Sequence, residues 1–220
     1  MIARGGRAAS GGMRLPGSAE DTAGQAIALF DFDHTVSADD SLKDFLLYAV
    51  GRTRLLLGAL ALSPLLVACA LGLIPREMAK ERVVSHFFGN WKYRHFASIA
   101  SAYSRERLPQ LVRPDALARI RWHQRRGHTV VIVTASLEDW IEGWCRAQGL
   151  GLIATRLDVE NGRVTGRFRG RNCNGAEKVR RIGLQYDLGA YDYVYAYGDS
   201  TGDNDMLALA DEKYYRWKRL

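Results

Sequence analysis

A doubly wound α/β fold with a parallel sheet and an inserted α-helical cap is the architecture that this sequence predicts. Short apolar runs, typical of buried strands, alternate with helical patterns over residues 26–42 and 111–220. The interval between the first two runs is much too long for a single crossover helix. Polar groups able to do chemistry directly follow three of the runs, as expected at the carboxyl edge of a parallel sheet.

The first expected strand is Ala26–Phe30, whose five residues are all apolar. Residues 41–110 then carry aliphatic and aromatic side chains at three- and four-residue spacing, which predicts an almost entirely helical segment. Residues 129–133 form a continuous β-branched run, typical of a strand buried on both faces of a parallel sheet.

The remaining elements follow from turn and periodicity signals. Gly149 is a stop signal for a helix over 137–148, and Asn161-Gly162 is a strong hairpin signal within 157–168. Further strands are expected at 152–155, at 193–197 and near Tyr214, and further helices at 176–184 and 203–210.

These elements predict a core made of residues 26–42 and 111–220, and a helical cap made of residues 43–110. Residues 1–25 are rich in Gly, Ala, Ser and Arg and contain no apolar run. We expect them to be a flexible tail, or an extension ahead of a start at Met13, and not a secretory signal.

Composition limits the partners. The net charge of +7 favours an anionic partner such as a phosphate ester or an anionic lipid, although a solvated basic surface is the alternative. Nucleic acid is not expected, because the basic residues are spread along the chain without a recognisable binding module. Three scattered cysteines, Cys69, Cys145 and Cys173, indicate a reducing, cytoplasmic setting. The sequence makes no prediction of oligomeric state.

Asp31 and Asp33 directly follow the first strand. In an extended backbone the i, i+2 spacing turns both carboxylates to one face, where they repel each other unless a cation is bound. Such a pair allows one carboxylate to attack while the other handles protons. A structural turn or a helix cap is the alternative for these two residues taken alone.

Two later strand ends and one lysine complete the candidate site. Thr134, Ala135 and Ser136 offer a hydroxyl and backbone N–H groups at the expected start of a helix, which is a ready anion site. The glycine turn at 198–203 presents Asp199 and Asp203, and Lys178 on an intervening helix supplies a mobile cation. Hard carboxylate oxygens with neighbouring phosphate-binding groups predict a Mg²⁺ site beside a phosphate cradle.

Four motifs therefore occur in order: Asp-x-Asp-x-Thr at 31–35, Thr134 after an apolar strand, Lys178, and Gly-Asp-Ser-x-x-Asp at 198–203. This arrangement resembles the haloacid dehalogenase (HAD) superfamily, whose core is Rossmann-like. A helical cap between the first two motifs is similar to the phosphoserine-phosphatase-like subfamily IB. The first motif, the long apolar cap segment and residues 171–179 look most like bacterial proteins related to phosphatidylglycerophosphatase C.

The resemblance implies a role for each matching residue. Asp31 is similar to the nucleophile that forms an aspartyl-phosphate, and Asp33 to the general acid/base. Mg²⁺ is implied at Asp31, at Asp199 and at the backbone carbonyl of Asp33, with Asp203 in support. The implied phosphate-binding residues are Thr134, Ala135 and Lys178.

Three positions depart from the family pattern. His34 and Ala135 stand where many relatives have glycine, and neither change removes a reactive group. Asp40 lies where phosphoserine phosphatases carry an acidic residue that binds the substrate amine, but its side chain is shorter. These departures bear on substrate choice and count against recognition of an amino acid.

The predicted function is a Mg²⁺-dependent phosphomonoester phosphatase, a hydrolase that forms an aspartyl-phosphate and acts on a lipid phosphate such as phosphatidylglycerophosphate. One alternative is a phosphatase of a small soluble ester, such as phosphoserine or a sugar or alcohol phosphate. Two further alternatives are phosphoryl transfer to an alcohol and a non-hydrolytic phosphate- or lipid-binding module.

Residues 55–74 are long and apolar enough to be a transmembrane candidate. A single crossing would place Asp31 and Lys178 on opposite sides of the membrane, although one site needs both. The segment is therefore either a hairpin broken at Pro64 and buried in the cap, or one that dips into a single leaflet. The flanking basic residues favour peripheral contact with an anionic membrane, at the cytoplasmic face of the inner membrane; they are Arg52, Arg54, Arg76 and Lys80.

Overall fold

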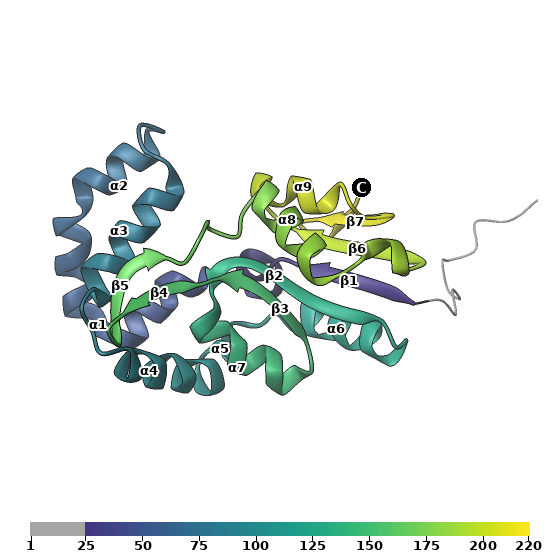
Figure 1. Cartoon of the computed structure of the whole chain (residues 1–220), viewed down its shortest axis with the longest axis horizontal. Helices are drawn as coiled ribbons and strands as arrows, with labels where there is room; N and C mark the ends of the chain where they lie inside the picture. The colour runs from purple at the N-terminus through teal and green to yellow at the C-terminus, as the bar shows by residue number, and fades with distance from the viewer. Residues whose placement is uncertain (1–24) are drawn as a thin grey trace, which may run out of the picture.

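The computed structural model describes residues 25–220, so the expected tail lies outside the described residues except for Gln25 (Figure 1). A six-stranded sheet in the order β3-β2-β1-β6-β7-β8 forms the core. Neighbouring strands are parallel from β3 to β7, and only the β7–β8 pair is antiparallel. The strands are β1 (Ala26–Phe30), β2 (Thr129–Leu137), β3 (Gly151–Thr155), β6 (Tyr193–Gly198), β7 (Glu212–Tyr215) and β8 (Lys218–Arg219).

Helices cover both faces of this sheet, which confirms the doubly wound arrangement. Alternate residues of β1 point to opposite faces. Ala28 and Phe30 join the apolar cluster under α6 (Pro114–Arg125) and α7 (Glu138–Gln148). Ile27 and Leu29 join the cluster under α8 (Ala176–Gln185) and α9 (Asn204–Leu207).

The cap is the block of helices between β1 and α6, and its helices α1 (Ser41–Ala61), α2 (Ser63–Ala70) and α3 (Arg76–Phe88) form the end of the molecule beyond the sheet (Figure 1). Phe45 is fully buried at its centre, within 6 Å of the rings of Phe88, Phe96 and Tyr103 and stacked on Trp140 of α7. This aromatic cluster joins the cap to the core. The remaining cap helices are α4 (Tyr93–Glu106) and α5 (Leu108–Leu111).

The hairpin β4 (Leu157–Glu160) and β5 (Arg163–Phe168) turns at Asn161-Gly162, as the sequence predicts. Both turn residues have positive φ, which Asn and Gly tolerate best. The hairpin packs against the cap: the backbone N–H of Phe168 donates to Glu81 of α3 at 2.8 Å. The cap boundaries at residues 43 and 110 remain predictions, but the cap surface includes this later hairpin.

Three elements differ from expectation. Helix α6 was not among the predicted elements. The helix expected over 203–210 is only α9, because Asp211 exchanges hydrogen bonds with Val194 and returns the chain to the sheet. Strand β2 continues beyond residue 133 to Leu137 through an irregular register against β3, so α7 begins at Glu138.

Candidate active site

The candidate residues meet where the carboxyl ends of β1, β2 and β6 come together beneath the cap. Asp31 directly follows β1, Thr134 lies in the last part of β2, and Asp199 directly follows β6. Asp31 is 7% exposed, and Lys178, Asp203 and Thr134 are buried almost completely. The fold thus gathers in one enclosed place residues that are far apart in the sequence.

Lys178 connects two of the carboxylates. Its Nζ donates to Asp31 Oδ1 at 2.6 Å, to Asp203 Oδ1 at 2.7 Å and to the carbonyl oxygen of Val133 at 2.7 Å. Three acceptors occupy the three N–H donors of an ammonium group. The expectation of a mobile cation is therefore wrong: three hydrogen bonds hold the ammonium group of Lys178, which lies in the first turn of α8 (Ala176–Gln185).

The electrostatics show an excess of buried negative charge. Burial raises the pKa of Asp31 to about 7, although the charge of Lys178 acts in the opposite direction. Burial also raises the pKa of Asp199, and the carboxylate of Asp203 adds to this effect. Burial would lower the pKa of Lys178, but its two carboxylate partners outweigh burial and raise the pKa. Lys178 thus forms ion pairs with Asp31 and Asp203 but not with Asp199.

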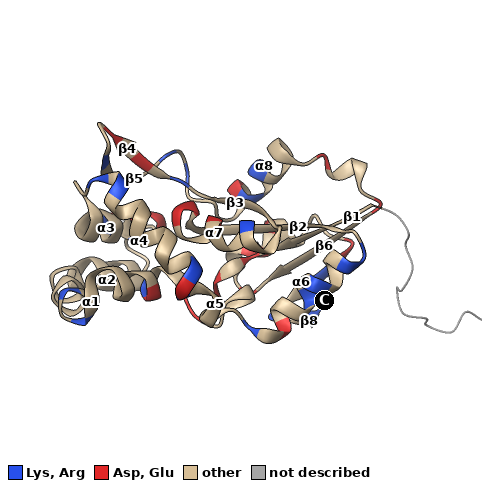
Figure 2. Cartoon of the chain, turned by 90° about the horizontal axis from the view of Figure 1, so that it is seen from below, with Lys and Arg blue, Asp and Glu red and all other residues tan. Residues whose placement is uncertain are grey.

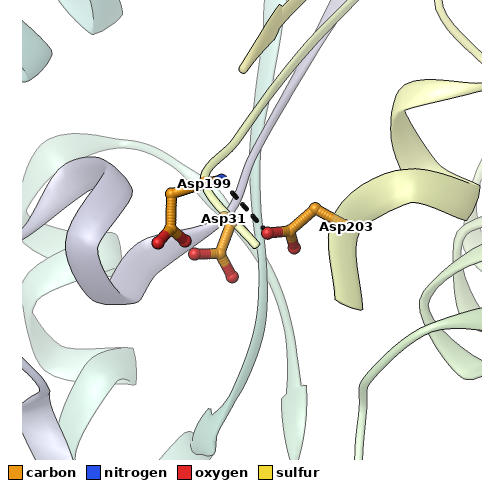
Figure 3. A group of neighbouring side chains, drawn as sticks. All are labelled: Asp31, Asp199 and Asp203. Carbon is orange, nitrogen blue, oxygen red and sulfur yellow. Dashed lines mark hydrogen bonds between the residues drawn. The ribbon is translucent and has the colours of Figure 1, made fainter. Parts of the chain in front are cut away.

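The three carboxylates together form a group that could bind a divalent cation. Oxygens of Asp31, Asp199 and Asp203 lie within 4.8 Å of one another, and Figure 3 shows Asp31 between the other two side chains. The other oxygen of Asp203 is fixed by the backbone, because the N–H groups of Asp199 and Ser200 donate to its Oδ2 at 3.2 and 3.0 Å. The hard oxygen donors and the uncompensated charge both fit Mg²⁺.

Asp33 has other partners. Its Oδ1 accepts from the backbone N–H of Ser41 at 2.7 Å, and its Oδ2 accepts from Ser136 Oγ at 2.5 Å. The strand ends at Phe30 and the turn Phe32–Val36 follows, so the two carboxylates of the first motif have different hydrogen-bond partners, although the charge of Asp33 still contributes to the raised pKa of Asp31. Burial raises the pKa of Asp33, and the nearby charge of Asp40 raises it further.

The two departures near Asp33 have structural explanations. His34 has φ of 60°, in the left-handed region that glycine adopts most easily, so a glycine would fit this position without strain. Asp40 is the N-cap of α1, where its carboxylate accepts from the backbone N–H of Lys43 at 2.9 Å. Its position is therefore explained by helix capping.

Thr134 and Ala135 do not begin a helix. The hydroxyl of Thr134 accepts from the backbone N–H of Ser136 at 3.0 Å, within the irregular end of β2. The expected anion site at a helix N-terminus is wrong here, since α7 starts later, at Glu138. As an acceptor, the Thr134 hydroxyl retains its own hydrogen for donation to a phosphoryl oxygen.

Sequence reasoning missed the residues that close the site. Lys80 of α3 donates from Nζ to the carbonyl oxygen of Ala135 at 2.7 Å, so it faces the core instead of flanking the apolar segment at the surface. At the C-terminal side, Arg216 Nε donates to the carbonyl oxygen of Asp199 at 3.1 Å, and Trp217 Nε1 to that of Thr35 at 3.2 Å. These contacts join distant elements and leave no periodic signal in the sequence.

The fold and the site define a haloacid dehalogenase-like hydrolase: the model of that family matches residues 28–208, and the chain belongs to it. Protein CicA of Caulobacter vibrioides is 37% identical over 196 residues, which cover 86% of this chain and 85% of CicA. A probable phosphatase of Mycobacterium tuberculosis is 31% identical over 127 residues, which cover 56% of this chain and 44% of that protein.

Solved structures share the fold. A protein of unknown function from Bordetella pertussis Tohama I superposes with a TM-score of 0.74 at 25% identity, covering 87% of this chain and 89% of that one. A phosphoserine phosphatase solved as an analogue of its phospho-aspartyl intermediate gives a TM-score of 0.57 at 20% identity, covering 87% of this chain and 86% of that one. The second likeness shows the fold alone.

Proposed function

We propose that this protein is a Mg²⁺-dependent phosphomonoester phosphatase that works through an aspartyl-phosphate. The observation that carries the proposal is the contact of Lys178 with Asp31 and Asp203, beside Asp199. A nucleophile held by a buried ammonium group, next to further carboxylates, is an arrangement that a simple binding module does not need. Membership of the hydrolase family and the matched probable phosphatase support the same chemistry.

The residues divide the reaction into two displacements. An oxygen of Asp31 attacks phosphorus, the bond to the leaving oxygen breaks, and Asp33 protonates that oxygen. Asp33 then removes a proton from water, which attacks phosphorus and releases Asp31 and inorganic phosphate. Ser41 and Ser136 orient Asp33 through both of its carboxylate oxygens. This separation of partners suits separate roles for the two aspartates.

The phosphoryl group carries charge that the site has to balance. The Thr134 hydroxyl is placed to contact its oxygens, and the positive charge of Lys178, held beside Asp31, provides electrostatic stabilisation through its field. Asp31 and Asp199, with the backbone carbonyl of Asp33, would hold Mg²⁺, and Asp203 would support them. The metal supplies neutralisation of phosphoryl oxygen charge when it is bound.

The substrate that we propose is a lipid phosphate such as phosphatidylglycerophosphate. The capping role of Asp40 disfavours recognition of a substrate amine at that position. The apolar side chains exposed on the cap helices suit an ester with acyl chains. A small soluble phosphomonoester is the competing substrate class.

A phosphate-release assay tests the proposal. Purified protein is incubated with an aryl phosphate and with a panel containing phosphatidylglycerophosphate, phosphoserine and a sugar phosphate, with Mg²⁺ or with EDTA. We expect Mg²⁺-dependent release from the aryl phosphate and preference for the lipid phosphate. No release from any ester contradicts the phosphatase proposal, whereas preference for phosphoserine contradicts only the lipid substrate. Product analysis in the presence of an alcohol distinguishes hydrolysis from transfer.

A further inference from the structure

A large apolar surface lies on the tip of the cap, which we define as residues 55–74. None of the eight residues of α2 is buried, although the helix is almost entirely apolar. The buried-hairpin alternative from the sequence is therefore wrong for α2. Seven large apolar side chains of this tip are more than two fifths exposed: Leu56, Leu57, Leu60, Leu66, Val67, Leu71 and Leu73.

The shape of the tip allows contact with one leaflet of a membrane. Within residues 25–220 no single helix is long and apolar enough to cross a membrane, whereas α1 and α2 together are, with a bend of 65° between them. At 1.5 Å per residue, the eight residues of α2 extend only about 12 Å. A helix of this length can enter one leaflet but cannot span the hydrocarbon core of a bilayer, which is about 30 Å thick.

The position of the active-site residues also excludes a single crossing of the membrane by residues 55–74. Asp31 precedes the tip and Lys178 follows it, yet these side chains are 2.6 Å apart in one site. Both ends of the apolar segment therefore lie on the same side of any membrane that it contacts. A shallow insertion of the bend satisfies this requirement.

The charge around the tip matches anionic lipid. From residue 45 to residue 76 the sequence contains no Asp or Glu, but it contains three arginines, Arg52, Arg54 and Arg76, and all three are exposed. In Figure 2, α2 contains no charged residue, and blue segments lie on the neighbouring part of α1. A second copy of the chain docked symmetrically on this surface would bring the arginines of both copies together, which is unfavourable.

A neighbouring groove offers a place for an acyl chain. It is lined by Val50, Leu57, Phe87 and Trp91, with Arg54 also in its wall. Apolar walls beside a guanidinium group match the two parts of an anionic lipid, the chain and the headgroup. The groove therefore favours lipid over a flat protein partner.

We propose that the tip of the cap docks on an anionic membrane surface, with the leucines of α1 and α2 inserted into one leaflet and the arginines at the headgroups. This inference goes beyond the proposed phosphatase chemistry, and binding is measured without turnover. Failure of docking and failure of catalysis are thus separate results.

Vesicle co-sedimentation of the full chain tests the inference. The vesicles are phosphatidylcholine alone, or phosphatidylcholine mixed with phosphatidylglycerol, at low salt. We expect stronger binding to the mixed vesicles. The double variant Leu60→Glu, Leu71→Glu should weaken this binding at least tenfold, and Arg52→Gln, Arg54→Gln should weaken binding to the mixed vesicles several-fold.

The matched control is Leu184→Glu on α8, a leucine 70% exposed on the core. It should bind vesicles as the wild type does, and all variants should keep aryl-phosphate hydrolysis and the thermal transition of the wild type. Absence of wild-type binding at low salt overturns the proposal, as does equal loss in the Leu184 control. A wild-type dimer in sedimentation velocity that the double variant converts to a monomer assigns the surface to a second copy instead, and also overturns it.

Discussion

The ammonium nitrogen of Lys178 lies 2.6 Å from Asp31 Oδ1, although the two residues are 147 positions apart in the sequence. Neither side chain can reorient freely, because Lys178 also donates to Asp203 and to the Val133 carbonyl oxygen. The contact therefore holds one oxygen of Asp31 and directs the carboxylate towards the space beside Asp199. A fixed nucleophile lowers the cost of reaching the attacking geometry.

Replacement of Lys178 tests this relationship. Lys178→Met should lower kcat/KM at least about a hundredfold, because it removes a charged donor from the site and leaves two buried carboxylates without their partner. It should also lower the free energy of unfolding by about 3–5 kcal/mol in the absence of metal, the usual cost of breaking a buried ion pair. Steady-state kinetics and chemical denaturation measure these effects. The control Lys218→Met, at an exposed lysine of β8, should change neither, and a fully active Lys178→Met would contradict the proposed role.

Substitutions of the two aspartates of the first motif should affect turnover differently. Asp31→Asn should abolish turnover, because an amide is a very poor nucleophile at phosphorus. Asp33→Asn should lower kcat by about 10²–10⁴-fold while retaining phosphate binding, since it removes proton transfer and leaves the nucleophile. Rapid-quench detection of a covalent phosphoenzyme checks the assignment. Wild-type turnover by purified Asp31→Asn would show that the covalent mechanism is wrong.

Local sequence patterns predicted most strands and helices of the core. They failed where contacts between distant elements determine the direction or the exposure of a side chain. The strand Ala26–Phe30 and the Asn161-Gly162 hairpin follow from composition and turn chemistry, and both are confirmed. The inward direction of Lys80 depends on how the cap sits on the core, so its basic character alone suggested a surface role. The same limit applies to α2, whose apolar composition fits burial and membrane contact equally until exposure is known.

The metal requirement should depend on Asp199. Asp199→Ala should raise the Mg²⁺ concentration needed for half-maximal rate at least tenfold, because it removes a carboxylate from the cluster with Asp31 and Asp203. Calcium should support turnover poorly, since its larger and looser coordination shell misplaces the nucleophile. Metal titrations of the rate, and of binding by calorimetry, measure both effects. Equal rates with Mg²⁺ and Ca²⁺ would count against a positioned Mg²⁺ site.

The contact from Lys80 to Ala135 should hold the cap on the core. Burial lowers the pKa of Lys80, whereas the negative charges of Asp33 and Asp40 act in the opposite direction. Lys80→Met should raise KM for an aryl phosphate several-fold and speed backbone hydrogen exchange in α3, because a link between cap and core is lost. Arg82→Met, at an exposed position of the same helix, is the control. Unchanged exchange in Lys80→Met would contradict this linking role.

The buried histidine His123 should make the fold sensitive to mild acid. It is fully buried, and its ring nitrogens lie 2.8 Å from His128 Nδ1 and 2.9 Å from the Tyr197 hydroxyl. Burial, with the neighbouring His128, lowers the pKa of His123 from 6.5 to about 2. The unfolded chain therefore binds a proton below pH 6.5 that the folded chain does not, so stability is complete above that pH and falls as the pH decreases.

The slope of this decrease is the measurable quantity. Between pH 6.5 and 5 the free energy of unfolding should fall by up to about 1.4 kcal/mol per pH unit from His123, and burial lowers the pKa of His128 in the same direction. His123→Gln should be less stable at pH 7, because hydrogen bonds are lost, but its stability should vary less with pH. The control His95→Gln, at an exposed histidine of α4, should retain the wild-type slope. Urea denaturation at several pH values measures the slope, and an unchanged slope in His123→Gln would contradict a neutral buried imidazole at this position.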